Sequence, residues 1–271
     1  MIRIRMKFPF FLFLPLFFVF DSFAKVTKPF PGEETSFHGF SMFSDPKKGT
    51  KIVVPQKIAP GKPWVWRARF WGHEPQFDLA MLELGYHVVF CNVGNLFGNH
   101  EAIERGNKFY DYLVTQHEFS KKAILEGMSR GGLFIYNWAA ANPEKVAAIY
   151  GDAPVLDFKS WPGGKGNGKG SASAWKTCLM AYGLTEEKAK DFSGNPIDNL
   201  QALAKAGISI IHVVGAADII VPVAENTTIA EKRYQKLGGV FEVIQKEGVG
   251  HHPHSLKDPA PIVSFILRNQ K

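Results

Sequence analysis

Ser129 lies in a short segment that could form the turn of a serine nucleophile. The segment reads Gly-Met-Ser-Arg-Gly-Gly over residues 127–132, between the apolar stretch Ala123–Glu126 and a helical pattern that begins near Arg130. A serine at a sharp strand-to-helix turn needs close neighbours without a Cβ atom, which the glycines supply. The following helix would direct its dipole and the backbone N–H of Arg130 towards a developing oxyanion. The pattern predicts an acyl-transfer nucleophile, and a helix-capping serine is the structural alternative.

Two downstream loops supply an acid and a base. A serine hydroxyl needs a base to remove its proton, and the base needs an acid to fix its tautomer. Asp218 follows the predicted strand Ile208–Val214, and His251 follows the predicted strand Phe241–Gln245. Ligand chemistry gathers beyond the carboxyl ends of strands in parallel sheets. We therefore predict Ser129, His251 and Asp218 as a catalytic triad, and the alternative for Asp218 is a residue that only shapes its turn.

Both partners of the serine have alternatives nearby. Asp152 also follows a predicted strand, Val146–Tyr150, and is the second choice of acid. His252 is the second choice of base. Three histidines this close, His251, His252 and His254, could instead bind a transition metal, but no nearby Cys and no His-Glu-x-x-His helix supports such a site. We predict no metal and no cofactor.

Strand and helix signals alternate along the remaining chain. This alternation predicts the α/β class, with a doubly wound, mostly parallel sheet. Residues 155–194 interrupt it with a glycine-rich run at 163–170 and two short helical patterns, which predicts a lid-like insertion with a mobile loop. The predicted strands are Ile52–Val54, Trp64–Phe70, Tyr86–Val93, Ala123–Glu126, Val146–Tyr150, Ile208–Val214 and Phe241–Gln245, and the predicted helices are Pro75–Gly85, His100–Phe119, Arg130–Ala141, Pro196–Ala206 and Val223–Leu237.

The first 24 residues have the order of a signal peptide. Arg3, Arg5 and Lys7 precede an apolar run at 8–20, and the small residues Ser22 and Ala24 follow it. A helix formed by this run would be shorter than a bilayer core is thick. We expect cleavage after Ala24, export to the periplasm or the exterior, no membrane association afterwards, and one domain over residues 25–271.

The charge distribution and the two cysteines argue against a nucleic-acid-binding protein and against a disulfide-bonded one. The 271-residue chain has a formal net charge of +7, of which residues 1–24 contribute +2. The remaining basic residues are scattered rather than clustered, so we predict no nucleic-acid partner. The two cysteines, Cys91 and Cys178, lie far apart in the sequence, and we expect them to be unpaired. The oligomeric state is not indicated.

The order Ser, Asp, His resembles that of the α/β-hydrolase superfamily, and the resemblance extends over nearly all of residues 25–271. More narrowly, segments 64–75, 127–132 and 248–254 are similar to a group of exported bacterial hydrolases associated with polysaccharide breakdown, in which carbohydrate esterases occur. This likeness implies an α/β-hydrolase fold and a hydrolytic activity on an ester.

The resemblance also implies a role for each residue. Ser129 would be the nucleophile, His251 the general base and acid, and Asp218 the acid that orients His251. The second oxyanion donor would come from the loop after the strand at 64–70. That loop lacks a His-Gly-Gly-Gly segment, so we assign the donor to the backbone N–H of Trp71. A serine at the nucleophile position excludes a dehalogenase.

Three functions fit these residues. The first is a secreted esterase of an acetylated or methyl-esterified carbohydrate, with a small-molecule or polysaccharide ester as substrate. The second is a serine peptidase or amidase, although peptidases with this fold usually carry a large additional domain. The third is a binding protein that retains the fold without catalysis, which the presence of all three triad residues disfavours.

Several other residues are candidates for substrate binding. Trp161 and Trp175, in the insertion, could offer ring faces to sugars. Arg69 and Arg130 flank the predicted site and could hold an acidic group through charge-assisted hydrogen bonds. Both arginines could equally be solvated or paired with nearby glutamates. His100 begins a helix just beyond a strand end and could line the cleft.

Overall fold

The computed structural model describes residues 29–270, so the predicted signal peptide lies outside the described residues. None of the helices in this range combines the length and apolar character that a membrane span requires. The strands are β1 Glu33–Phe37, β2 Phe40–Asp45, β3 Thr50–Val54, β4 Trp64–Arg67, β5 His87–Cys91, β6 Ala123–Met128, β7 Val146–Asp152, β8 Ser209–Gly215 and β9 Phe241–Lys246. The α-helices are α1 Gln76–Glu83, α2 His100–His117, α3 Gly131–Ala141, α4 Ala172–Tyr182, α5 Glu186–Lys190, α6 Gln201–Lys205, α7 Thr227–Lys236 and α8 Ala260–Asn269. Four 3-10 helices are η1 Gly94–Leu96, η2 Pro143–Lys145, η3 Pro196–Asp198 and η4 Val223–Glu225.

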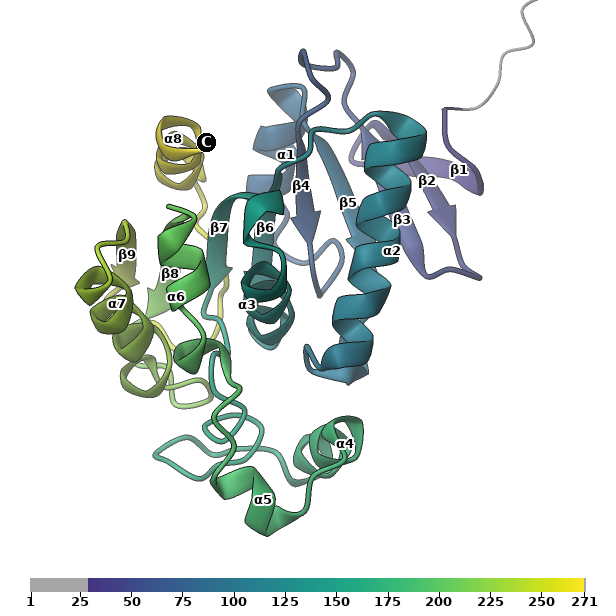
Figure 1. Ribbon diagram of the computed structural model, residues 1–271. Coiled ribbons are helices and arrows are strands. Elements are labelled where there is room, and N and C mark those ends of the chain that lie inside the picture. Colours follow the sequence, from purple (N-terminus) through teal and green to yellow (C-terminus); the bar gives the residue numbers. More distant parts are fainter. Residues whose placement is uncertain (1–28, 271) are drawn as a thin grey trace, which may run out of the picture.

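One twisted sheet contains all the strands of the described region, in the order β1-β2-β3-β5-β4-β6-β7-β8-β9. The strands from β5 to β9 in this order are parallel, whereas β1, β2 and β3 pair antiparallel with their neighbours. Helices cover both faces: α2, α3, α6 and α7 lie on one, and α1 and α8 on the other (Figure 1). The predicted α/β class and mostly parallel, doubly wound sheet are confirmed.

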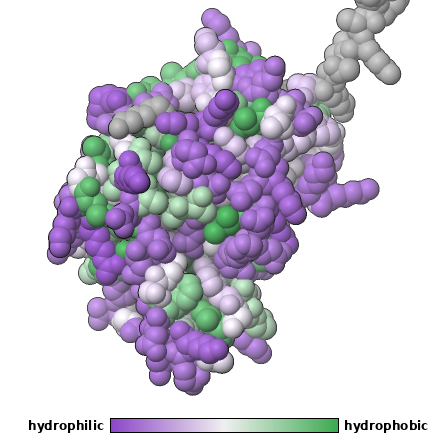
Figure 2. All heavy atoms as spheres, viewed as in Figure 1, coloured by the Kyte–Doolittle hydropathy of each residue, from purple (hydrophilic) through white to green (hydrophobic). Residues whose placement is uncertain are grey.

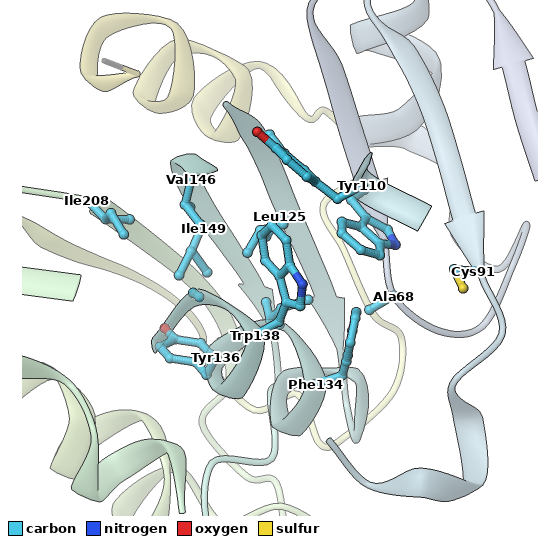
Figure 3. Close-up of a cluster of buried hydrophobic side chains, with 14 of the residues drawn as sticks. Ala68, Cys91, Tyr110, Leu125, Phe134, Tyr136, Trp138, Val146, Ile149 and Ile208 are labelled. Carbon is cyan, nitrogen blue, oxygen red and sulfur yellow. The ribbon is translucent and has the colours of Figure 1, made fainter. Parts of the chain in front are cut away.

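The central strands are buried along their whole length. Every residue of β6, β7 and β8 is buried, which is the condition of parallel strands covered on both faces. Figure 3 shows Phe134 and Trp138 of α3 packed towards Leu125 of β6, with Ile149 of β7 beside them. Figure 2 shows the outer face of this helix layer as mostly hydrophilic, so the apolar side chains of the helices are directed inwards.

The first parallel strand is shorter than predicted. β4 ends at Arg67 instead of Phe70, because Phe70 adopts a left-handed backbone conformation with φ 52° and begins a turn in which the N–H of His73 donates to its carbonyl at 3.1 Å. Strands β1 and β2 and helix α8 had no predicted counterpart. The predicted helices at 196–206 and 223–237 each begin as a 3-10 turn, η3 and η4, before α6 and α7.

The segment predicted as an insertion lies beyond the carboxyl ends of the parallel strands, where Figure 1 shows α4 and α5. Its residues Phe158, Trp175 and Cys178 belong to a separate apolar cluster that also includes Phe97, Leu133 of α3 and Val221. Cys91 is buried in the main core, and both cysteines are free thiols.

The glycine-rich run at 163–170 is attached to its surroundings, contrary to the expectation of a mobile loop. The N–H of Asn167 donates to Glu225 at 2.5 Å, and Ser160, just before the run, donates to the same carboxylate at 2.6 Å. The N–H of Lys169 donates to the carbonyl of Ile219 at 3.3 Å. The run therefore packs on the loop that follows β8.

Candidate active site

Ser129 occupies a strained turn between β6 and α3. Its φ of +49° is uncommon for a residue with a side chain. The turn is held by neighbouring backbone: the N–H of Ser129 donates to the carbonyl of Asp152 at 2.8 Å, and its carbonyl accepts from Val155 at 2.9 Å. A Cβ atom on Gly132 would lie 2.7 Å from the carbonyl oxygen of Val155, so this position requires glycine. Strain of this kind persists where the surroundings determine the conformation.

Two consecutive side-chain hydrogen bonds link the three residues predicted as a triad. Ser129 Oγ lies 2.9 Å from His251 Nε2, and His251 Nδ1 lies 2.6 Å from Asp218 Oδ2. Because a carboxylate can only accept, His251 carries its proton on Nδ1 and presents the Nε2 lone pair to the serine hydroxyl. The side chains of His251 and Asp218 are 7% and 1% exposed. The structure thus brings together residues from three separate loops, each following a strand.

Asp218 is held as an anion by its own loop. Its Oδ1 atom accepts hydrogen bonds from the backbone N–H groups of Ile220 at 2.8 Å and Val221 at 2.9 Å. Burial alone would raise the pKa of Asp218, but the hydrogen bonds from His251 and these two N–H groups outweigh it and lower the pKa below the ordinary value. The ionised carboxylate can therefore stabilise an imidazolium on His251.

The loops that carry the acid and the base touch through a glycine. The N–H of Ala217 donates to the carbonyl of Val249 at 2.9 Å. A Cβ atom on Gly215 would lie only 2.1 Å from the carbonyl oxygen of Gly250, the residue before His251. The close approach at Gly215 thus sets the distance between the loops of Asp218 and His251.

Replacing Gly215 with alanine is expected to lower kcat/KM by about two orders of magnitude, because the added methyl group must push the His251 loop away, and displacements near 1 Å cost this much. Gly250→Ala is the matched control, since a Cβ there meets only the Ala217 carbonyl, at 3.8 Å. Steady-state kinetics on both variants provide the measurement. Equal kcat/KM in the two variants would contradict the assigned role of this contact.

The alternative acid, Asp152, has a different partner. Its Oδ1 atom lies 3.1 Å from His254 Nδ1, and its Oδ2 atom accepts from the backbone N–H of Ser255 at 2.6 Å. Both members of this second pair are buried. His252, the alternative base, is exposed, and its ring lies beside that of His251 without contacting Ser129. The geometry therefore favours Asp218 and His251 over Asp152 and His252.

The sequence predicts the backbone N–H groups of Arg130 and Trp71 as oxyanion donors. The N–H groups of Arg130 and Trp71 form no hydrogen bond within residues 29–270. Arg130 directly follows Ser129 at the N-terminus of α3. Trp71 lies in the loop after β4, the strand next to β6, and its ring packs against Phe37 and Phe90.

The turn that carries Trp71 is held by a buried arginine that the sequence analysis did not single out. Arg67 donates from Nε to the carbonyl of Phe70 at 3.3 Å, and from its terminal nitrogen to the carbonyl of His73. The guanidinium is 1% exposed and forms ion pairs with Asp78 and Glu126. An arginine inside a strand pattern was the only signal that could have identified it.

The structure separates the residues predicted to bind substrate. Arg69 is half-buried next to the nucleophile turn, with its Cβ atom 3.1 Å from a Cβ placed on Gly131, and its Nε atom has no partner. Burial lowers the pKa of Arg69. The glutamates considered as partners are engaged elsewhere, Glu101 with Arg105 and Glu74 with Gln76. Arg69 therefore remains available to an anionic group.

Arg130 faces the insertion. Its guanidinium lies 5.7 Å from the centre of the Phe97 ring and lines a cavity of about 220 Å³. Ser173 and Thr177 of α4 also line this cavity. A larger cavity of about 360 Å³ between β3 and α2 contains none of the predicted site residues.

The prediction that Trp175 offers a face to sugars is wrong. Its side chain is 7% exposed, packs against Phe158, and donates from Nε1 to Glu186 at 2.6 Å. It is buried because it belongs to the apolar cluster through which the insertion packs on Phe97 and on Leu133 of α3. His100 is the exposed first residue of α2 and makes no hydrogen bond to Ser129 or His251. Trp161 is half-buried, with its ring centre 6.4 Å from that of Phe97.

Comparisons with known proteins identify the fold. The chain matches no protein-family model and no curated protein sequence. Among solved structures, it is similar to the acylaminoacyl peptidase of Pyrococcus horikoshii, with a TM-score of 0.60 and 13% identity over 82% of this chain and 39% of that chain. It is also similar to a puromycin hydrolase, with a TM-score of 0.61 and 14% identity over 87% of this chain and 37% of that one.

A third similar structure is dipeptidyl peptidase 4 of Porphyromonas gingivalis, with a TM-score of 0.63 and 14% identity over 88% of this chain and 35% of that chain. This chain thus spans little more than a third of the length of these proteins. Identities this low define the fold alone. Together with the sheet order and the serine at the turn after β6, they show that the chain has the α/β-hydrolase fold.

Proposed function

We propose that this protein is a serine hydrolase that cleaves an acyl bond through a covalent intermediate on Ser129. The observation that carries the proposal is the series from Ser129 through His251 to Asp218, with the serine in a strained turn at the start of α3. Fold alone does not determine activity, whereas this site has the geometry that acyl transfer requires.

In the proposed reaction, Ser129 Oγ attacks the carbonyl carbon while His251 Nε2 accepts the hydroxyl proton. The resulting oxyanion is stabilised by the N–H groups of Arg130 and Trp71. His251 then donates the proton to the leaving alcohol or amine, and the acyl group remains on Ser129. Water, activated by the same nitrogen, releases the acid, and Asp218 holds His251 in one tautomer throughout.

Two substrate classes follow from different observations. A peptide or amide substrate is favoured by the similar structures, two of which are described as peptidases and one as a puromycin hydrolase. An acetylated or methyl-esterified carbohydrate was the first expectation from the sequence. The burial of Trp175 removes one argument for sugars. We therefore place amide or peptide substrates first and carbohydrate esters second, with Arg69 as the proposed contact for an acidic group in either.

A fluorophosphonate is expected to label Ser129 stoichiometrically, because a base-activated serine attacks phosphorus as it attacks a carbonyl carbon. The purified protein is then compared on aminoacyl p-nitroanilides, p-nitrophenyl acetate, acetylated xylan and methyl-esterified pectin. Peptide mapping with Ser129→Ala as the control measures the labelling. A protein that is neither labelled nor active on any of these substrates would contradict the proposed function.

We further propose export, with cleavage after Ala24. The support is the sequence of basic residues, apolar run and small residues in 1–24. N-terminal sequencing of the protein isolated from its host should begin at Lys25. A soluble protein that retains Met1 would contradict this proposal without affecting the hydrolase.

A further inference from the structure

Three histidine rings crowd the loop after β9. The ligand atoms of His251, His252 and His254 all lie within 4.8 Å of one another. The ring centres are 4.7 Å apart for His251 and His254, 4.7 Å for His252 and His254, and 5.1 Å for His251 and His252. The proposed hydrolysis uses only His251 directly, so it does not account for the other two.

Two of these histidines are oriented as metal ligands usually are. Asp218 accepts from His251 Nδ1 at 2.6 Å, and Asp152 lies 3.1 Å from His254 Nδ1. A carboxylate at Nδ1 fixes the proton there and leaves the Nε2 lone pair available, which is the arrangement that supports imidazole binding to a metal ion. Within the described part of the chain, no hydrogen bond engages His254 Nε2.

The third histidine is accessible to solvent. His252 is exposed and forms no hydrogen bond within residues 29–270. The His73 ring, 6.2 Å from that of His252, lies at the edge of the same cluster.

We propose that His251, His252 and His254 bind a borderline transition-metal ion, such as Zn²⁺, Ni²⁺ or Cu²⁺, and that the bound ion blocks hydrolysis. Imidazole is a preferred ligand of all three ions. The block rests on the proposed function, because the His251 Nε2 lone pair that would bind the ion is the one that must accept the Ser129 proton. The ion gains three nitrogen ligands and retains water, no covalent bond is broken, and the Ser129 hydroxyl loses its hydrogen bond to His251.

The geometry needs only local adjustment. Zinc binds imidazole nitrogen at about 2.0–2.1 Å, so tetrahedral ligand atoms lie roughly 3.3 Å apart. The present separations, up to 4.8 Å, require the rings to rotate towards a common centre. The exposed His252 makes the largest movement, whereas the other two rings tilt while Nδ1 of each stays hydrogen-bonded to Asp218 or Asp152.

Metal binding is measured first without catalysis. In the Ser129→Ala background, titration calorimetry with Zn²⁺ or Ni²⁺ should show one site. His252→Gln should lower the metal affinity of this site by about tenfold or more, since one of three protein ligands is lost. The matched control is His117→Gln, at the far end of α2. Equal affinity in the His252→Gln and His117→Gln variants, or the absence of binding, would overturn the site, whether or not the protein is a hydrolase.

Inhibition is then measured in the chain with Ser129 intact. Zn²⁺ should lower p-nitrophenyl acetate hydrolysis by more than about tenfold, and a chelator should restore it, as expected when the general base is occupied. His252→Gln should keep the uninhibited rate and need a higher Zn²⁺ concentration for the same loss. Activation by Zn²⁺, or loss of activity on chelation, would overturn the block and indicate a metal cofactor instead.

Discussion

Replacing Ser129 with alanine is expected to lower the turnover of any ester or amide substrate by about four to six orders of magnitude. In the proposed mechanism the hydroxyl oxygen forms the covalent bond, and no other nucleophile lies within hydrogen-bonding distance of His251 Nε2 among residues 29–270. Steady-state kinetics on the best substrate measure the loss. Urea unfolding should show unchanged stability, since the substitution removes one hydroxyl from a turn held by backbone hydrogen bonds.

The partners of Ser129 should behave as one unit with it. His251→Ala and Ser129→Ala/His251→Ala should be as inactive as Ser129→Ala, because the base has no function without the nucleophile. Asp218→Asn should cost about 10⁴-fold, as expected when the carboxylate that fixes the tautomer is lost. Asp152→Asn serves as the comparison and should cost far less, since Asp152 contacts His254. A larger loss for Asp152→Asn than for Asp218→Asn would reverse the assignment of the acid.

The parts of the site that the sequence could predict are those encoded locally. Gly127 and Gly132 around Ser129 indicate a turn of restricted geometry, and the apolar stretch before it indicates a buried strand. Asp218 and His251 were recognisable because each follows a strand signal in the expected order. Parallel strands place their carboxyl ends at one edge, so separate loops must converge.

The remaining features depend on contacts between distant segments. Nothing near Asp152 indicates that it pairs with His254, 102 residues later. Trp175 was predicted as an exposed ring because its polar neighbours suggested a surface, whereas α4 directs it inwards against Phe158. The edge strand β1 and its neighbour β2 were missed because neither contains a continuous apolar run, and four of the five residues of β1 are exposed. The role of Arg67 was also not predictable, since its partners Asp78 and Glu126 lie 11 and 59 residues away in the sequence.

The ion cluster around Arg67 contains one cation and two carboxyl groups, all of them buried. Burial alone would lower the pKa of Arg67, but the charges of Asp78 and Glu126 outweigh it and raise the pKa. Burial, with a further contribution from Asp78, raises the pKa of Glu126 well above its ordinary value despite the opposing effect of Arg67. The raised pKa favours the protonated form of Glu126, in which the ion pair of Arg67 with Asp78 carries the charge of the cluster.

Arg67→Met is consequently expected to lower the free energy of unfolding by about 3–5 kcal/mol, because it leaves the Asp78 carboxylate buried without a counter-ion. Glu126→Gln should change the free energy of unfolding by about 1 kcal/mol or less, since glutamine has nearly the shape of the protonated carboxyl group that the raised pKa of Glu126 favours. Urea unfolding at neutral pH measures both. Equal destabilisation by the two substitutions would show that Glu126 is ionised in the native state.

The pH dependence of stability separates these possibilities further. Native Glu126 retains a proton that the unfolded chain releases above the ordinary glutamate pKa, so the folded state binds more protons in the interval between the two pKa values. Glu126 therefore lowers the stability of the wild-type protein as pH rises through that interval. The Glu126→Gln variant does not have this pH-dependent loss of stability. The stability of Glu126→Gln relative to wild type should increase with pH. A difference that stays constant from mildly acidic to mildly alkaline pH would mean that Glu126 has an ordinary pKa and that Arg67 balances two buried anions.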